Sequence, residues 1–370
     1  MAATQNKMKK YFNEEELVLP STALPGDKRI YTFDAGGSLF KLAYTAGGRN
    51  QVKIKMVTFS SLDLSDAATF IREEIIGDDD RTDVKVVGTG IGRWLFLHEY
   101  GSELGISQND LTDEFACFGK GLHYMLTELN ESAYLYPYED PTVPTRSEFG
   151  MNAVKFVKVT EEEEHRMREK QDTFPALLVF CGSGLGYILV DEDGSVNMIG
   201  GSLVAGSAFH SIGKLLTGAE TYDELMEFAR NGDSTVCTTT VKDLNVDEYA
   251  NMNLASFNEK FVYEILPFGN IVMKHLENPR KEDLARSLLH MIGSDIVYSV
   301  FSFARAYKLN KCYLAGSFFA DEAEIAKQFI RDRLPMITNI FAWPVYARFM
   351  KFEGYIGAIG AMIHCIKSKS

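Results

Sequence analysis

Two short glycine-rich turns, one in each half of the chain, are the segments best suited to bind an anion. Each joins two apolar segments. Their residues are Gly36, Gly37 and Ser38 in the first turn and Gly182, Ser183 and Gly184 in the second. Because glycine has no Cβ, the N–H groups of such a turn can approach an anion closely. The pair of turns predicts two loops that close on one phosphate chain from opposite sides.

The two turns differ in charge. Asp34 precedes the first turn and Lys41 follows it, whereas the second turn carries neither an acid nor a base. A carboxylate at a strand end is suited to hold Mg²⁺, directly or through water, and the alternative role for Asp34 is to stabilise the turn. Lys41 would reach the same phosphates as a point charge. This asymmetry favours a metal-bound nucleotide phosphate over a symmetric structural repeat.

A pair of acids, Asp113 and Glu114, begins a helix predicted over 112–128. Phosphoryl transfer to an alcohol needs a group that accepts the hydroxyl proton, and either carboxylate could do so. Adjacent helical residues point about 100° apart, so we expect only one of the two to face the site. Acids at a helix start are also explained by the helix dipole alone. The pattern by itself does not choose between the two residues.

The elements that must position these residues form a repeated pattern of strands followed by helices. The predicted strands are 30–35, 38–45 and 51–59 in the first half and 176–181, 186–191 and 196–203 in the second. A helix over 62–76 and helices from about 207 follow them. This layout predicts an α/β fold with two related actin/hexokinase-like (ribonuclease H-like) halves. Each half would hold a mixed five-stranded sheet flanked by helices, with a cleft between the halves.

A charged stretch over 161–170 separates the two halves. We expect a disordered tail over 1–28, an N-terminal half over 29–175 and a C-terminal half over 176–370. In the second half we predict long helices over 255–277 and 281–307 and a strand over 340–346. The last helix, over 354–366, is expected to pack back on the N-terminal half.

The composition excludes several functional classes. With 370 residues, 46% of them hydrophobic and 24% charged, the chain has the make-up of a globular protein. A net charge of −13 argues against a nucleic-acid partner. There is no apolar run of about 18 residues, so we expect no membrane span. Five scattered cysteines predict neither a disulfide framework nor a zinc site, and a cytoplasmic location is expected.

The motifs resemble those of eukaryotic-type (type II) pantothenate kinases. The resemblance covers about 30–362, and its stretches, in order, are 34–41, 113–122, 182–184, 216–222, 232–235, 281–286 and 353–361. It implies that ATP and Mg²⁺ are used to phosphorylate pantothenate to 4′-phosphopantothenate, the first step of coenzyme A biosynthesis. It also implies a homodimer built through 255–307, which a paralogous chain could complete, and feedback inhibition by CoA or acyl-CoA.

The resemblance further implies a role for each candidate residue. It selects Glu114 over Asp113 as the general base and Asp34 as the metal ligand. The implied ATP-phosphate ligands are Gly36, Gly37, Ser38, Lys41, Gly182, Ser183 and Gly184. The implied adenosine contacts are Gly316, Gly354 and Gly357, and the implied substrate contacts are Ser183, Asn197 and Gly206. From its sequence context, Gly316 is equally well explained as a strand-to-helix turn.

Two positions depart from the family's pattern. Asn197 stands where the family has an Arg on the strand after the second loop, and Ala320 stands where it has another Arg. Because two cationic contacts are missing, two further hypotheses stay open. One is a catalytically weak relative that binds nucleotide or acyl-CoA as a regulatory or partner subunit. The other is a kinase of the same fold that acts on a different alcohol.

Overall fold

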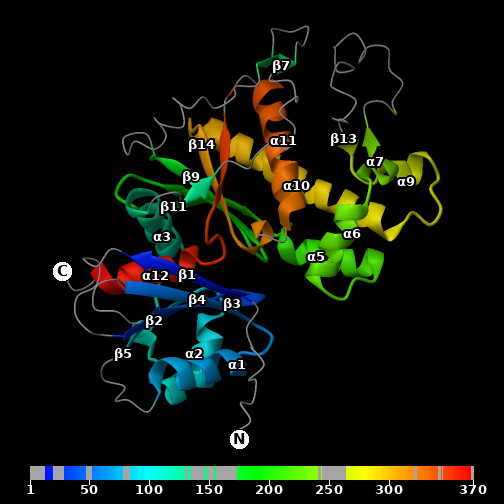
Figure 1. Cartoon of the computed structure of the whole chain (residues 1–370). Helices are drawn as coiled ribbons and strands as arrows, with labels where there is room; N and C mark the ends of the chain where they lie inside the picture. Colours follow the sequence, from blue (N-terminus) through cyan, green and yellow to red (C-terminus); the bar gives the residue numbers. More distant parts are fainter. Residues whose placement is uncertain are drawn as a thin grey trace, which may run out of the picture. The chain divides into compact units, whose positions relative to one another are not determined.

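A computed structural model shows that the chain forms two compact units (Figure 1). The first comprises Met1–Ser132, Val190–Asn197 and Phe352–Ser370, and the second comprises Ala133–Leu189 and Met198–Lys351. The second unit thus begins well before the boundary expected at 175/176. The structure describes residues 13–19, 29–46, 52–77, 84–129, 132–134, 146–147, 154–155, 173–240, 243, 264–320, 323–340, 343 and 345–367.

The first unit contains a five-stranded sheet with the strand order β1-β4-β3-β2-β5. The strands are β1 (Asn13–Leu19), β2 (Arg29–Ala35), β3 (Leu39–Ala46), β4 (Val52–Ser60) and β5 (Val84–Thr89). β5 is parallel to β2, and the other pairs are antiparallel. The sheet is therefore mixed. In it β2 lies between β3, with which it forms a hairpin, and β5, to which it is connected by a crossover.

The strand β1 was not expected, because the prediction for residues 1–28 was a disordered tail. That prediction is wrong for 13–19, where β1 pairs with β4; 1–12 and 20–28 lie outside the described residues. Leu17 is buried in the sheet. On the neighbouring positions Glu16 pairs with Lys53 at 2.7 Å. Glu14 and Glu16 thus lie on the polar face of an edge strand, not in a solvated tail.

Alternation along β2 assigns its side chains to two faces of the sheet. Phe33 packs edge-on against Phe96, with ring centroids 5.0 Å apart. On the opposite face Thr32 donates a hydrogen bond to Ala358 O at 2.8 Å. The helices on the Phe33 face are α1 (Ser65–Phe70), continued by the π-helix η2 (Ile71–Ile76), and α2 (Arg93–Leu104). On the Thr32 face lies α12 (Ile356–Lys367), which in turn packs on α3 (Glu114–Glu128) (Figure 1).

The second sheet has the strand order β11-β10-β9-β14-β15-β6. Its strands are β6 (Ala133–Tyr134), β9 (Ala176–Cys181), β10 (Leu185–Val190), β11 (Val196–Ser202), β14 (Lys311–Ala315) and β15 (Tyr346–Met350). The order β11-β10-β9-β14 repeats β4-β3-β2-β5. The next position is β15 in the second sheet, whereas in the first it is a single parallel bridge between Gly88 and Leu111. The predicted α/β fold with two related mixed-sheet halves is confirmed, except that the second sheet has six strands, not five.

Four helices and the second sheet form the core of the second unit. They are α5 (Gly206–Thr217), α6 (Tyr222–Asn231), α10 (Lys281–Ala306) and α11 (Glu324–Ile340). Among the described residues, α10 alone is long and apolar enough to cross a membrane by length and composition. Its apolar residues Leu288, Ile292 and Ile296 are buried in this core. The remaining short elements are η4 (Gln108–Asp110), β7 (Arg146–Ser147), β8 (Val154–Lys155) and η8 (Ser317–Phe319).

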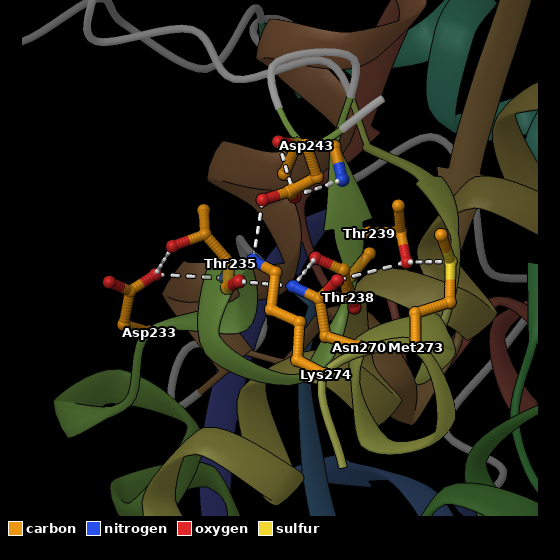
Figure 2. A network of polar contacts seen from close by, with 9 residues as sticks. Asp233, Thr235, Thr238, Thr239, Asp243, Asn270, Met273 and Lys274 are labelled. Carbon is orange, nitrogen blue, oxygen red and sulfur yellow. Dashed lines mark hydrogen bonds and ion pairs between the residues drawn. The ribbon is translucent and has the colours of Figure 1, made fainter. Parts of the chain in front are cut away.

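The helix predicted over 255–277 is wrong for its described part. Residues 264–277 contain β13 (Glu264–Leu266) and the short helix α9 (Gly269–Met273), beside α7 (Ser234–Cys237) and β12 (Thr239–Thr240). Asn270 holds these elements together, because its amide nitrogen donates to Thr235 O and Thr238 O and its oxygen accepts from the Thr239 hydroxyl (Figure 2). The strand predicted over 340–346 is also wrong: α11 runs to 340, and β15 begins at 346.

Candidate active site

Asp34 is a buried carboxylate at the end of β2. Its side chain is 1% exposed, and neither carboxylate oxygen has a hydrogen-bond partner in the part of the chain that the structure describes. Lys41, also buried, is its register partner on β3. Burial raises the pKa of Asp34, and the positive charge of Lys41 opposes that shift. An unpaired buried carboxylate is costly for the fold, which indicates that it serves a ligand.

Two glycines leave room for the Asp34 carboxylate. A Cβ on Gly90 would lie 2.5 Å from Asp34 Oδ1, and a Cβ on Gly357 would lie 2.5 Å from Asp34 Oδ2. Gly90 follows β5 and has a φ of 90°, and Gly357 lies in the first turn of α12. Because a Cβ would clash with the carboxylate at either position, only glycine lets the backbone pack this closely against its two oxygens.

The neighbouring acids at the start of α3 have different tasks. Asp113 is the N-cap, and its Oδ1 accepts a hydrogen bond from Ala116 N at 2.8 Å. Its carboxylate is therefore occupied in stabilising the helix. Glu114, the first helical residue, is half-buried and makes no such capping contact. The structure thus distinguishes the two acids that the sequence pattern left equivalent.

The environment of Glu114 suits a general base. Burial raises its pKa to about 7, and the negative charge of Asp34, with a smaller effect of Asp113, acts in the same direction. Lys41 and Arg93 oppose the shift. A carboxyl whose pKa lies near neutral pH can accept a proton from a substrate and release it afterwards. Asp34, Lys41 and Glu114 are therefore neighbours within the first unit.

In the first loop one predicted phosphate donor, the N–H of Gly36, is already used in hydrogen bonds that close the turn. Gly36 N donates to Leu39 O at 3.0 Å and to Asp34 O at 3.2 Å, which closes the turn. Gly37 and Ser38 are exposed at its tip. The backbone N–H of Gly37 and the Lys41 ammonium remain suited to a phosphate, and Ser38 adjoins them.

The second loop is built in the same way in the second unit. Gly182 N donates to Gly184 O at 2.9 Å. The carbonyls of Gly182 and Ser183 accept hydrogen bonds from Gly206 N and Ser207 N, at 3.0 and 3.1 Å, at the start of α5. The structure thus brings together two predicted substrate contacts, Ser183 and Gly206. The N–H of Gly182, like that of Gly36, donates a hydrogen bond inside its own turn.

The predicted adenosine contacts have distinct surroundings. Gly316 has a φ of 101°, and a Cβ there would lie 2.3 Å from Cys181 O, so packing against β9 already explains this glycine. Gly357 lies against Asp34, as described above. Gly354 lies in a turn before α12, not within the helix, and has nothing within 4 Å of a built Cβ.

The two departures from the expected cationic pattern lie at different places in the fold. Asn197 is exposed on β11, at the end of the segment Val190–Asn197 that belongs to the first unit. Ala320 is half-buried and follows η8 in the second unit. Neither position carries a charge, so neither supplies the cation that the resemblance implies for it.

Asp34 fits a Mg²⁺ ion. Mg²⁺ is usually held by one or two carboxylates together with waters and substrate phosphates, and Asp34 offers two buried oxygens without hydrogen bonds beside the first loop. The described residues contain no group of three or more His, Cys, Asp or Glu side chains that could hold a metal without such a substrate. A metal here would therefore depend on the phosphates that it accompanies.

Sequence reasoning missed Gly90 and Arg93 as site residues. Gly90 directly follows β5. Arg93 lies at the start of α2, and its Nη1 donates to Gly90 O at 2.7 Å. The available signal was the position of both residues directly after β5, whose end lies beside the end of β2.

The repeated mixed sheets, with a buried aspartate and a helix-borne glutamate beside one turn, define an α/β protein of two related halves. Residues 30–364 match the Fumble family, the type II pantothenate kinase family, and the chain belongs to that family. The match covers both loops, α3 and the part of α12 that ends at His364.

Individual relatives are more distant. Pantothenate kinase 1 of Arabidopsis thaliana is 27% identical over 352 residues, covering 89% of this chain and 83% of the relative. The 4′-phosphopantetheine phosphatase of Mus musculus is 25% identical, covering 90% of this chain but 40% of its own length. Pantothenate kinase 2 of Oryza sativa subsp. japonica is 24% identical, covering 93% and 40%. This chain therefore spans well under half of the mouse and rice proteins.

Among solved structures, a glucokinase from an Antarctic psychrotroph aligns with 93% of this chain and 100% of its own chain. The TM-score is 0.40 and the identity is 13%. This similarity is too low to carry an argument about function.

Proposed function

We propose that this protein phosphorylates pantothenate with ATP to give 4′-phosphopantothenate. The observation that carries the proposal is the buried Asp34 carboxylate, which has two oxygens without hydrogen bonds between Gly90 and Gly357 and has Lys41 and Glu114 as neighbours. Membership of the Fumble family supports a kinase, and relatives named pantothenate kinase support the choice of substrate.

In this proposal each residue of the first unit has one task. The N–H of Gly37, the adjoining Ser38 and the Lys41 ammonium bind nucleotide phosphates. Asp34 would hold Mg²⁺, which neutralises charge on the phosphates when it is bound. Glu114 accepts the proton of the substrate's primary hydroxyl as that oxygen attacks the terminal phosphorus.

The finer properties of the enzyme are proposals of the same kind. Ser183, Asn197 and Gly206 would contact pantothenate, and Gly182, Ser183 and Gly184 would bind phosphates of the nucleotide. Gly316, Gly354 and Gly357 would lie near its adenosine. A homodimer, inhibition by CoA or acyl-CoA and a cytoplasmic location are further expectations. The described part of 255–307 that would form the dimer includes α9 and α10.

The test is pantothenate-dependent ADP production from Mg·ATP by the full chain, measured beside Glu114→Gln. We expect turnover in the wild type and a loss of about 10²- to 10⁴-fold in the variant, because glutamine cannot accept the proton. Asp113→Asn is the matched control, since asparagine also caps helices well. Turnover without pantothenate, or equal turnover by Glu114→Gln, would contradict the proposed reaction or its base.

A second candidate function is a partner subunit that binds nucleotide or acyl-CoA without efficient turnover. The uncharged side chains of Asn197 and Ala320 favour it, and a phosphatase is among the named relatives. Calorimetric binding of Mg·ATP or acyl-CoA by a protein that shows no turnover would support this candidate. Turnover by the isolated chain would exclude it.

A further inference from the structure

Arg93 is a charged side chain of the candidate site that the roles above do not use. It is the first residue of α2 and is half-buried. Its Nη1 donates to Gly90 O at 2.7 Å, and its guanidinium carbon lies 5.7 Å from the ring centroid of Trp94. These two contacts hold the guanidinium at the glycine that lies over Asp34 Oδ1.

The guanidinium has hydrogen-bond donors to spare. Arginine carries five N–H donors in a planar fork, and the hydrogen bond to Gly90 O uses one of them. In the described part of the chain Arg93 forms no ion pair, although its charge is close enough to affect Glu114. Glu114 is therefore nearby, and it does not occupy the fork.

The position of Arg93 in α2 is unfavourable without an anion. The N-terminus of a helix carries partial positive charge, so a cation in the first turn is repelled. The first turn of α2 contains no acidic residue that would offset this repulsion. A bound anion beside Gly90 would remove the conflict, because both the helix dipole and the guanidinium would then attract it.

We propose that Arg93 binds the phosphoryl group that is transferred, an inference that rests on the proposed function. In that reaction the bond between the terminal phosphorus and the bridging oxygen of ATP breaks and ADP leaves. A bond from the same phosphorus to the substrate oxygen forms, and the hydroxyl proton passes to Glu114. The guanidinium fork bonds two of the non-bridging oxygens of the moving group throughout, and it stabilises the charge spread over them.

The test compares the affinities of Mg·ATP and Mg·ADP by titration calorimetry, without pantothenate, in the wild type and Arg93→Met. ADP lacks the group that Arg93 contacts. We therefore expect Arg93→Met to bind Mg·ATP about 10- to 100-fold more weakly while its affinity for Mg·ADP stays unchanged. Arg72→Met is the control, because Arg72 pairs on the surface of the same unit with Glu103; it should change neither affinity.

Three outcomes decide the matter. An equal change for both nucleotides, or none for ATP, overturns the role of Arg93 and leaves the proposed function standing if the wild type turns over pantothenate. A wild type that binds neither nucleotide overturns both. If Arg93→Met does not fold, as judged by circular dichroism, Arg93→Gln replaces it. Glutamine keeps a donor for Gly90 O but has no charge, and the same ATP-selective loss is expected.

Discussion

The backbone around the two glycine-rich turns has the same geometry, which we call the frame of each turn. The two turns differ in the side chain at the end of the central strand that precedes them. Gly90 and Gly316 both have a left-handed φ, of 90° and 101°, directly after a parallel neighbour strand. A Cβ on Gly90 would lie 2.5 Å from Ala35 O, and one on Gly316 would lie 2.3 Å from Cys181 O. The strand registers pair Asp34 with Thr89, the residue before Gly90, and Phe180 with Ala315, the residue before Gly316. The carboxylate of Asp34 in the first unit therefore corresponds to the phenyl ring of Phe180 in the second.

In each turn a backbone carbonyl also accepts a hydrogen bond from a serine hydroxyl, at positions that differ by one residue. The hydroxyl of Ser61, after β4, donates to Gly36 O at 2.9 Å. The hydroxyl of Ser207, after β11, donates to Ser183 O at 2.7 Å. The frame therefore belongs to the repeated fold, whereas the acid–base chemistry depends on side chains present in one copy.

The largest expected effect comes from altering the side chain at the end of each central strand in turn. Asp34→Asn should lower turnover by about 10³-fold or more, because an amide is a poor Mg²⁺ ligand. Phe180→Leu, at the corresponding position of the second unit, should keep most of the turnover. Steady-state kinetics of both variants measure the contrast. If Phe180→Leu lost as much activity as Asp34→Asn, the chemistry would not be confined to the first turn.

The Asp34→Asn variant should also be more stable than the wild type at neutral pH. The pKa of Asp34 is raised by burial, so the folded state binds more protons than the unfolded state above the unfolded pKa. The free energy of unfolding therefore falls as pH rises through that range. The amide that replaces the carboxyl does not titrate, so we expect a gain on the order of 1 kcal/mol at pH 7 from thermal unfolding without Mg²⁺. A lower melting temperature would contradict this account.

The pH dependence of kcat/KM should report the base of the first unit. With its pKa raised to about 7 by burial, Glu114 is protonated below that pH and cannot accept a proton. We expect kcat/KM to fall about tenfold per pH unit below 7. The charges that face Glu114 are those of Asp34, Lys41, Arg93 and Asp113. Asp113→Asn should hardly shift the pH below which kcat/KM falls. If kcat/KM of the wild type instead fell only below about pH 4.5, the ordinary pKa of a glutamate, Glu114 would not be the general base.

A smaller effect is expected from substituting Gly357, which lies against the carboxylate of Asp34; the second turn has no such carboxylate. In Gly357→Ala the new Cβ would displace Asp34 Oδ2, 2.5 Å away, and we expect turnover to fall at least about tenfold because the metal ligand moves. Gly360→Ala is the contrast, since its Cβ would meet Cys117 O at 1.8 Å on α3. Thermal unfolding should show the greater loss of stability in Gly360→Ala. Equal activity in Gly357→Ala and the wild type would contradict the assignment.

The smallest effects test whether the two frames are equivalent. Ser61→Ala and Ser207→Ala each delete one hydroxyl hydrogen bond to a turn carbonyl. Each should cost about 1 kcal/mol of stability in urea unfolding. A much larger loss in one variant would show that the two turns are held differently despite their shared geometry.

The sequence predicted the duplicated strands and the place of Asp34 and Lys41, because alternating apolar residues around a glycine turn fix the hairpin register. It could not choose between Asp113 and Glu114. Which of the two side chains turns back to cap the helix depends on the local geometry, and the hydrogen bond from Ala116 N shows that Asp113 does so.

Other features depended on contacts between distant segments. The strand β1 was missed because its glutamates suggested solvent, whereas their partners, Lys53 and Lys55, lie on β4. The short elements around α9 were missed because a buried asparagine, Asn270, organises them through partners more than 30 residues away. Gly357 was expected near adenosine, and its contact with Asp34 joins residues from nearly opposite ends of the chain.

The helix α12 sets the order in which the protein can be completed during synthesis. It belongs to the first unit, where Thr32 donates to Ala358 O and Thr58 shares a hydrogen bond with Tyr355. The ribosome makes this helix after the whole second unit, which ends at Lys351. The nascent first sheet therefore keeps one face uncovered until the second unit has been made. Asp34 acquires its neighbour Gly357 only from the segment that follows that unit.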